Sequence, residues 1–315
     1  MKKTNKVSIV GAGSVGATAA YALSLSGIVQ DLVIVDVNKE KALGEVLDLR
    51  HGSAFIKPMN ITTGDYEATK DSDIVVVTAG APQKPGETRI DLVNKNVSIF
   101  KSIIPEVAKY SPDAILLIVA NPVDILSYVA YKLSGFPQER VIGSGTVLDS
   151  SRLKYEISEE LNVDPRSIDA YIMGEHGDTE FPAWSLTNVE GIKLEKFAEE
   201  IGIDFNSEMK DKIHEAVKMG AYEVINRKGA TYYAIGLSIK RIVEAILGDE
   251  NAVLPVSVLV DNYYGVEDVY IGVPSIVNAD GIKKILKVDL DEKEVEQFKS
   301  SGFALKKVLE DSFLG

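Results

Sequence analysis

Cysteine is absent from the 315 residues of the sequence. Disulfides, thiolate catalysis and Cys-ligated zinc are therefore excluded, and because the sequence holds no other metal-binding motif we predict no metal site. Long apolar runs are also lacking, since no uninterrupted stretch approaches the roughly 18 residues that cross a bilayer. Basic residues are few, with 34 Lys and Arg against 47 Asp and Glu, for a formal charge of -13. Such a surface repels nucleic acid and anionic lipid, so we expect neither as a partner.

The N-terminus, MKKTNKVSIVGAGSVGATAA, has the lysines and apolar residues of a secretory signal, but three glycines interrupt it. We therefore expect a mature, cytoplasmic protein. The length allows one large α/β unit or two domains of about 150 residues each. An apolar content of 45% is enough for a sizeable core.

A strand, a helix and a second strand are expected over Lys6–Val10, Ser14–Ser26 and Asp31–Asp36. The turn after the first strand reads GAGSVG, which is typical of dinucleotide-binding βαβ units. In such units the first glycine makes the tight turn, the second lets the backbone approach a pyrophosphate, and the third lets helix and strand pack closely. The helix N-terminus then offers free N–H groups to the phosphates. The glycines of this turn are Gly11, Gly13 and Gly16.

Asp36 ends the second strand and is predicted to select the cofactor. Its carboxylate would accept hydrogen bonds from the ribose hydroxyls of an adenosine. It would repel a 2'-phosphate, and the following Val37 and Asn38 offer no arginine to receive one. The pattern therefore favours NAD over NADP. The alternative is a glycine turn in some other α/β protein.

Further apolar strands are expected over 73–77 and 114–119, and helices over 93–110 and 125–133. Strands that are apolar throughout and alternate with helices indicate a parallel sheet covered on both faces. The sequence therefore predicts an α/β fold with an N-terminal doubly wound parallel sheet. Ligands of such sheets bind beyond the carboxyl ends of the strands.

His176 is one of only three histidines and lies in the stretch MGEHGDTE. A short strand is expected over Ala170–Met173, so Gly174 and Gly177 would free the backbone just past a strand end and leave the imidazole facing a cleft. Histidine titrates near neutral pH, which suits an acid or base. The alternative for an isolated histidine is a hydrogen bond within its own turn.

Asp149 and Arg152 stand three residues apart near the start of a helix expected over Thr146–Leu161. They would project from neighbouring points of one face. The simplest interpretation is a local surface ion pair, which contributes little to stability. If His176 lies opposite, Asp149 would instead stabilise the imidazolium while Arg152 binds a substrate carboxylate through two hydrogen bonds.

The segment Ala81–Arg89, APQKPGETR, is expected to be a loop because two prolines and a glycine interrupt it. Gln83 and Arg89 are its candidates for chemistry. Two interpretations stay open: a solvated surface loop, or a lid that carries Arg89 onto a substrate and sheds water as it closes. Later in the chain we expect helices over 204–226, 232–247 and 291–310, and antiparallel strands over 252–260 and 269–277.

Seven motifs in order carry a resemblance that covers nearly the whole chain: GAGSVG, IVDVN, QKPGETR, VANPVD, GSGTVLDSSR, GEHGDTE and KGATYYAIG. Together they resemble the L-lactate and malate dehydrogenase family, and within it most closely the bacterial L-lactate dehydrogenases. The resemblance implies an N-terminal Rossmann domain (1–144), a mixed α/β catalytic domain (145–315) and, as is usual in the family, a homotetramer.

The resemblance also implies roles for individual residues. His176 would exchange a proton with the substrate oxygen, Asp149 would orient His176, Arg152 would bind the substrate carboxylate, and Arg89 would polarise the carbonyl. Asn121 and Thr231 match substrate-site positions. The positions that match cofactor contacts are Gly11, Gly13, Val15, Gly16, Asp36, Lys41, Tyr66, Gly80, Ala81, Ser102, Val119, Asn121 and Ser144.

Gln83 is predicted to select the substrate. Lactate dehydrogenases of the family have glutamine at this position, whereas malate dehydrogenases have arginine. Oxaloacetate would place a second carboxylate beside an uncharged amide, which costs several kcal/mol when the ion is poorly compensated. The expected reaction is therefore reversible hydride transfer between NADH and pyruvate, giving L-lactate, the last step of anaerobic glycolysis. The alternatives are a malate dehydrogenase, a branched-chain 2-hydroxy acid dehydrogenase, since charge does not exclude bulkier 2-oxo acids, and a noncatalytic NAD-binding protein.

Lys154 and Asp169 match the arginine and histidine that bind fructose 1,6-bisphosphate between subunits in many bacterial members of the family. Lysine keeps a positive charge, but aspartate would repel the phosphate. We therefore expect weak or absent activation by the bisphosphate.

Overall fold

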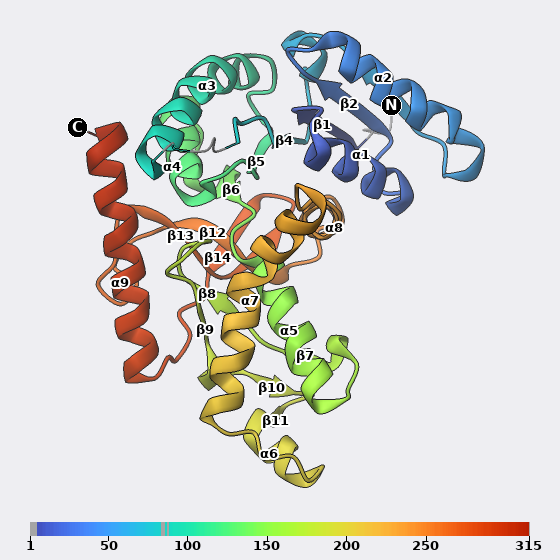
Figure 1. The fold of residues 1–315 in the computed structure, drawn as a ribbon. Coiled ribbons are helices and arrows are strands. Elements are labelled where there is room, and N and C mark those ends of the chain that lie inside the picture. Colours follow the sequence, from blue (N-terminus) through green and yellow to red (C-terminus); the bar gives the residue numbers. More distant parts are fainter. Residues whose placement is uncertain (1–4, 83–85, 87, 315) are drawn as a thin grey trace.

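A nine-stranded sheet runs through the computed structural model, which describes residues 5–82, 86 and 88–314 (Figure 1). The first six strands are parallel and lie in the order β6-β5-β4-β1-β2-β3, which is the doubly wound order. The sheet consists of β1 (Lys6–Val10), β2 (Asp31–Val35), β3 (Asn60–Thr63), β4 (Ile74–Val77), β5 (Ile115–Ile118), β6 (Val141–Gly143), β12 (Ala252–Val260), β13 (Val269–Asn278) and β14 (Gly281–Ile285).

The last three strands continue the same sheet as an antiparallel extension. β12 pairs with β6, where Ser257 lies opposite Gly143, and β13 and β14 follow outward. The sequence indicates β12 and β13 as an antiparallel pair, and that prediction is confirmed. It did not indicate that the pair joins the N-terminal sheet, because the contact depends on a register between residues more than a hundred positions apart.

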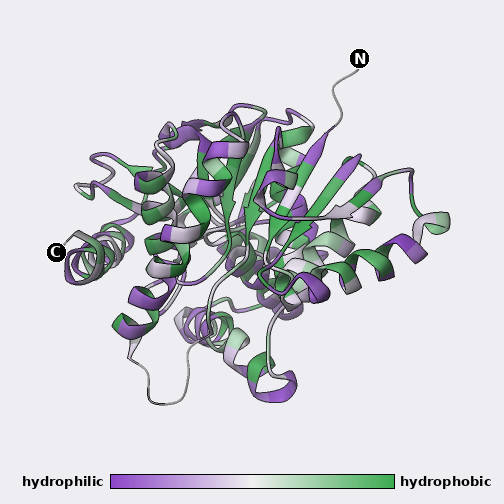
Figure 2. Cartoon of the chain, turned by 90° about the horizontal axis from the view of Figure 1, so that it is seen from above, coloured by the Kyte–Doolittle hydropathy of each residue, from purple (hydrophilic) through white to green (hydrophobic). Residues whose placement is uncertain are grey.

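Helices cover both faces of the parallel part. The chain runs from β1 to β3 in one direction along the sheet and from β4 to β6 in the other, so right-handed crossovers place α1 and α3 on opposite faces. α1 packs against α8, and α3 packs against α4. Figure 2 shows the apolar strands enclosed between helices of mixed hydropathy. The helices are α1 (Ser14–Ser26), α2 (Lys39–His51), α3 (Arg89–Tyr110), α4 (Val123–Ser134), α5 (Val147–Leu161), α6 (Leu194–Glu200), α7 (Ser207–Lys228), α8 (Tyr233–Leu247) and α9 (Glu292–Leu309).

A second, smaller core lies below the sheet in Figure 1, where α5, α6 and α7 meet short strands. Buried Leu153 and Ile157 of α5 pack there with Val217 of α7. The strands of this region are β7 (Ile168–Asp169), β8 (Ile172–Met173), β9 (Phe181–Pro182), β10 (Asn188–Val189) and β11 (Ile192–Lys193). This core fixes α5 against α7, and β8 lies beside α5. Within the described part of the chain, no helix is long and apolar enough to span a membrane.

α3 begins four residues earlier than the sequence predicted, at Arg89 instead of Val93. Thr88 caps the helix: its hydroxyl accepts the Asp91 N–H (3.1 Å), and the Asp91 carboxylate accepts the Thr88 N–H (3.0 Å). Arg89 is therefore a helical residue, and the expectation that it belongs to the loop was wrong. Gln83 lies outside the described residues, as does the Arg89 side chain.

Candidate active site

The glycine turn after β1 has the geometry of a phosphate cradle. Gly11 has a φ of +115°, and a side chain on Gly16 would place its Cβ 1.9 Å from the Gly11 carbonyl oxygen. Gly13, in contrast, faces open space, with no atom within 4 Å of a Cβ built on it. It precedes α1 without a side-chain cap, so the first N–H groups of the helix are available to an anion.

Asp36 is held at the end of β2 by two backbone groups. The Ala12 N–H donates to Oδ2 (2.6 Å), and the Asn38 N–H donates to Oδ1 (2.8 Å). Each carboxylate oxygen keeps a lone pair for a ribose hydroxyl. Tyr66 lies close enough that burial, together with the Asp36 charge, raises the pKa of its phenol. These residues fit the adenosine half of NAD.

The neighbouring strand ends supply the rest of the predicted cofactor site. Asn96, a buried residue of α3, joins two of them: Oδ1 accepts the Ala81 N–H (2.8 Å), and Nδ2 donates to the Asn121 carbonyl (2.8 Å). This role was not predicted, because in the sequence Asn96 resembles any polar residue of a helix. Gly80, Val119 and Ser144 follow β4, β5 and β6, and Val15 lies in the first turn of α1.

Two predicted cofactor residues are exposed and make local hydrogen bonds. The Lys41 N–H donates to the cap residue Asn38, and the Ser102 hydroxyl donates to the Ile99 carbonyl within α3. Their contact with a cofactor stays a prediction.

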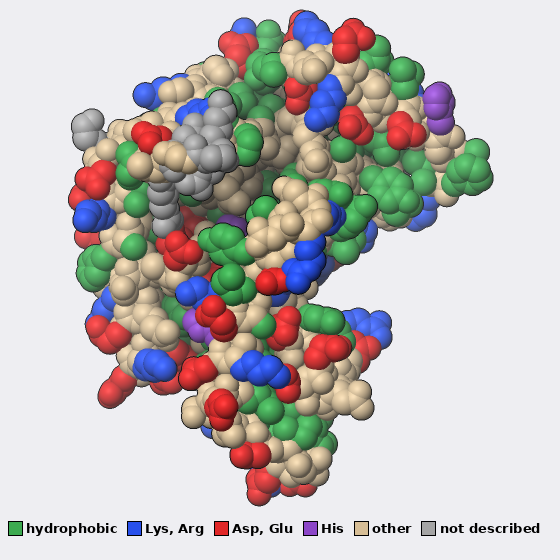
Figure 3. Space-filling view, in the orientation of Figure 1, with side chains coloured by type: hydrophobic (Ala, Val, Ile, Leu, Met, Phe, Trp, Pro, Cys, Tyr) green, Lys and Arg blue, Asp and Glu red, His purple; other side chains and the backbone are tan. Residues whose placement is uncertain are grey.

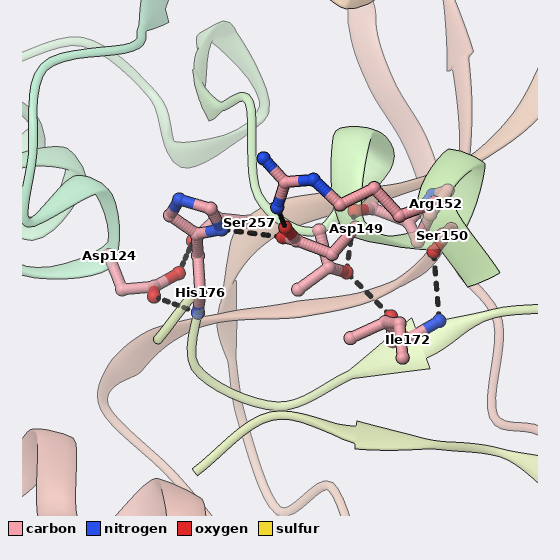
Figure 4. Close-up of polar contacts among 9 residues, drawn as sticks. Asp124, Asp149, Ser150, Arg152, Ile172, His176 and Ser257 are labelled. Carbon is pink, nitrogen blue, oxygen red and sulfur yellow. Dashed lines mark hydrogen bonds and ion pairs between the residues drawn. The ribbon is translucent and has the colours of Figure 1, made fainter. Parts of the chain in front are cut away.

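His176 and Asp149 are brought together, as the sequence suggested (Figure 4). His176 Nδ1 lies 2.5 Å from Asp149 Oδ2, and Arg152 Nη1 donates to Asp149 Oδ1 (2.6 Å). The His176 loop follows β8, which the Ser150 hydroxyl ties to α5 by accepting the Ile172 N–H (2.8 Å). Because the ring uses Nδ1 for Asp149, Nε2 is the nitrogen left for a substrate. The interpretation of Asp149 and Arg152 as a simple surface pair was wrong, since Asp149 is 1% exposed.

Asp124 supports the histidine from the other side and was missed in the sequence. Its Oδ2 accepts the His176 backbone N–H (2.8 Å), and its Oδ1 accepts the Ser257 hydroxyl (2.5 Å), as Figure 4 shows. The sequence signal that could have identified it is an acidic residue in the first turn of an otherwise apolar helix, directly after the Asn121-Pro122-Val123 segment. Asp124 thus connects α4, β12 and the His176 loop.

The charges of the site favour an imidazolium. Burial lowers the pKa of His176, but the charge and hydrogen bond of Asp149, followed by the charges of Glu180 and Asp124, outweigh burial and raise the pKa to about 9. Burial raises the pKa of Asp149, yet His176 and Arg152 hold it below its usual value. Burial raises the pKa of Asp124 to about 6, against the opposing hydrogen bonds from Ser257 and His176.

Arg152 has room to bind an anion beside this pair. Its side chain is 21% exposed and uses Nη1 for Asp149. The stem passes Gly220 of α7, where an added Cβ would lie 3.4 Å from Arg152 Cδ. Thr231 lies in the break between α7 and α8. A proton donor and a guanidinium that share one buried carboxylate suit a substrate carrying both a carbonyl and a carboxylate.

Comparisons with known proteins agree with this geometry. The family model described as the NAD-binding domain of lactate/malate dehydrogenases matches residues 5–143, and the model of the alpha/beta C-terminal domain matches residues 146–314. The chain belongs to the lactate/malate dehydrogenase family. The predicted family and the predicted fold class are confirmed, and the NAD-binding assignment agrees with the cradle around Gly13 and Asp36.

Several members of the lactate/malate dehydrogenase family are similar over their full length. An L-lactate dehydrogenase of Clostridium botulinum is 59% identical over 311 residues, covering 99% of this chain and 98% of the relative. L-lactate dehydrogenase 1 of Clostridium acetobutylicum is 55% identical over 313 residues, covering 99% and 100%. The crystal structure of the minor L-lactate dehydrogenase from Enterococcus mundtii, in a ligands-bound form, is 45% identical, with a TM-score of 0.96 and 99% of each chain covered.

Gly13→Ala and Gly16→Ala should have different effects in this family member. A methyl group on Gly16 would meet backbone, so we expect Gly16→Ala to lower the free energy of unfolding by more than about 1 kcal/mol. A methyl group on Gly13 meets no protein atom but occupies the cradle, so we expect unchanged stability and a Kd for NADH at least about tenfold higher, a loss of about 1.4 kcal/mol. Denaturant unfolding and NADH fluorescence titration measure the two effects. Equal loss of stability in both variants would contradict this account.

Proposed function

We propose that this protein is an NAD-dependent L-lactate dehydrogenase that interconverts pyruvate and L-lactate as the last step of fermentation. The observation that carries the proposal is the array in which Asp149 is shared by His176 and Arg152. The curated relatives that are 55–59% identical over nearly the whole chain are named L-lactate dehydrogenases, which supports it.

In the proposed reaction Arg152 binds the substrate carboxylate and so directs the 2-oxo group toward His176 Nε2. When bound, the cofactor would supply the hydride chemistry at its nicotinamide ring, as acceptor in lactate oxidation and as donor in pyruvate reduction. During pyruvate reduction His176 donates its proton to the carbonyl oxygen, and during lactate oxidation the neutral imidazole takes the proton back. Asp149 keeps the ring oriented and stabilises its charged form. Arg89, at the start of α3, is proposed to polarise the carbonyl.

The test is NADH oxidation with pyruvate and with oxaloacetate in parallel. We expect a pyruvate preference of orders of magnitude, and loss of turnover in His176→Asn. Because reduction needs the imidazolium, kcat for pyruvate should be steady below the pKa of His176 and fall as pH rises through about 9. Lactate oxidation needs the neutral ring and should rise over the same range. Preference for oxaloacetate would identify a malate dehydrogenase, and no NADH oxidation with either substrate would refute catalysis of this kind.

We propose that Gln83 sets this preference, as its match to the family implies. Gln83→Arg should move specificity toward oxaloacetate by orders of magnitude, because a guanidinium would compensate the second carboxylate. Gln83→Leu, which supplies no charge, is the matched control. A variant with arginine that keeps the parental ratio of kcat/KM values would refute this assignment.

We propose that the protein needs no phosphorylated activator. Lys154 Nζ lies 4.0 Å from Asp169 Oδ1. The positive charge that could bind a phosphate is therefore already paired with a carboxylate of the same chain. Fructose 1,6-bisphosphate should therefore leave the KM for pyruvate unchanged, whereas Asp169→His, which replaces the repelling carboxylate, should introduce sensitivity to the bisphosphate. A severalfold drop in KM for the unmodified protein at micromolar bisphosphate would contradict the proposal.

We further propose that the chain has two domains divided at 144/145 and that the protein is cytoplasmic.

We also propose a homotetramer. Hydrophobic side chains gather over α1, α2 and α8 in Figure 3, which supports an oligomer because exposed apolar patches often mark protein interfaces. The exposed apolar residues of these helices include Tyr21, Leu25, Leu43, Leu47, Tyr233 and Leu237.

A further inference from the structure

Glu180 is a third titratable group beside His176 and Asp149. It lies four residues after His176, directly before β9, and is 6% exposed. One oxygen from each of the two carboxylates and one imidazole nitrogen all lie within 4.8 Å of one another. The reaction proposed above gives Glu180 no role.

The Glu180 carboxylate differs from the other buried acids near it. Asp124 accepts two hydrogen bonds, and Asp149 binds both His176 and Arg152. Among the described residues, 5–82, 86 and 88–314, no group donates a hydrogen bond to the Glu180 carboxylate. Burial and the nearby Asp149 charge therefore favour the neutral acid, and only neighbouring positive charge opposes them.

The charged groups around Glu180 come from several elements. α5 contributes Asp149 and Arg152, and α7 contributes Lys218 and His214, whose Nε2 lies 3.3 Å from the Glu180 carbonyl. Asp124 of α4 acts on the same imidazole. Burial, followed by the Asp149 charge, raises the pKa of Glu180 to about 8, against the lowering effect of His176, Arg152 and Lys218.

We propose that Glu180 is a positioning residue that controls the charge of His176. When Glu180 is ionised, its negative charge stabilises the protonated imidazole of His176. When Glu180 is neutral, the positive charge of Arg152 is not compensated by Glu180 and attracts an anionic substrate more strongly. The second part rests on the function proposed above, whereas the coupling to His176 does not require that function.

Two opposite effects on catalysis follow from the coupling. When Glu180 ionises, the imidazolium persists to higher pH, which preserves the proton donor. The same ionisation places a negative charge near the substrate carboxylate, which weakens binding. The KM for pyruvate should therefore rise above pH about 8 while kcat for reduction persists to higher pH.

The direct test is the titration of His176 by NMR of the full-length protein with ¹³Cε1-labelled histidine. The sequence holds only three histidines, and His176→Asn identifies the resonance of interest. In Glu180→Gln the titration midpoint of His176 should fall by about one pH unit, because an opposite charge within about 4–6 Å has been removed. Glu180→Asp, which keeps a carboxylate, should restore most of the difference. An unchanged midpoint in Glu180→Gln overturns the proposal.

Glu294→Gln is the matched control. Glu294, in the first turn of α9, is also buried, but its carboxylate accepts the Ser185 N–H. It should alter stability without moving the His176 midpoint, and a midpoint that moves equally in both variants overturns the proposal. If Glu180→Gln does not fold, the unmodified protein decides: its His176 resonance should titrate in more than one step, because two carboxylates and the imidazole lie within 4.8 Å of one another and titrate together. A single inflection overturns the proposal.

Kinetics separate this inference from the proposed function. In Glu180→Gln the KM for pyruvate should stay flat through pH 8, and the alkaline fall of kcat should move to lower pH. If the unmodified protein does not oxidise NADH with pyruvate, the proposed function fails, and the NMR titration still judges the coupling. If the unmodified protein oxidises NADH with pyruvate but Glu180→Gln keeps the parental pH profiles of KM and kcat, the coupling is refuted and the proposed function stands.

Discussion

The active site depends on one buried carboxylate shared by two positive groups. Asp149 is nearly inaccessible to solvent and keeps its charge only because Arg152 and His176 both bind it. Removing one partner of such a group typically costs about 3–5 kcal/mol, because the remaining charge is left uncompensated. The loop after β8 must therefore be held at a fixed distance from α5, so that His176 and Arg152 both reach Asp149.

The surrounding structure supplies that agreement. The second core packs α5 against α7, and the Ser150 hydroxyl ties β8 to α5. From the opposite side, Asp124 accepts hydrogen bonds from the His176 backbone N–H and from the Ser257 hydroxyl of β12. The His176 loop is therefore held in position relative to the sheet. These are contacts to backbone or between elements, which explains why no short motif contains them.

The parts that the sequence predicted are those that local rules determine. The strand Lys6–Val10, the helix Ser14–Ser26 and the glycine turn between them depend on neighbouring residues, and their predicted bounds were correct. Asp124 and Glu180 were missed because their significance comes from contacts across the fold: Asp124 binds a residue 52 positions away. The start of α3 was missed for a smaller reason, since the reciprocal bonds of Thr88 and Asp91 extend the helix into a segment that its proline content marks as loop.

The continuous sheet limits how the protein can admit a substrate. β6 of the N-terminal part and β12 of the C-terminal part are paired in the sheet, and α1 of the N-terminal part also packs against α8 of the C-terminal part. A rigid-body opening of the two halves would break backbone hydrogen bonds and separate apolar surfaces at once. The orientation of the N-terminal half relative to the C-terminal half is therefore set by backbone hydrogen bonds within one sheet and not by a hinge between separate sheets.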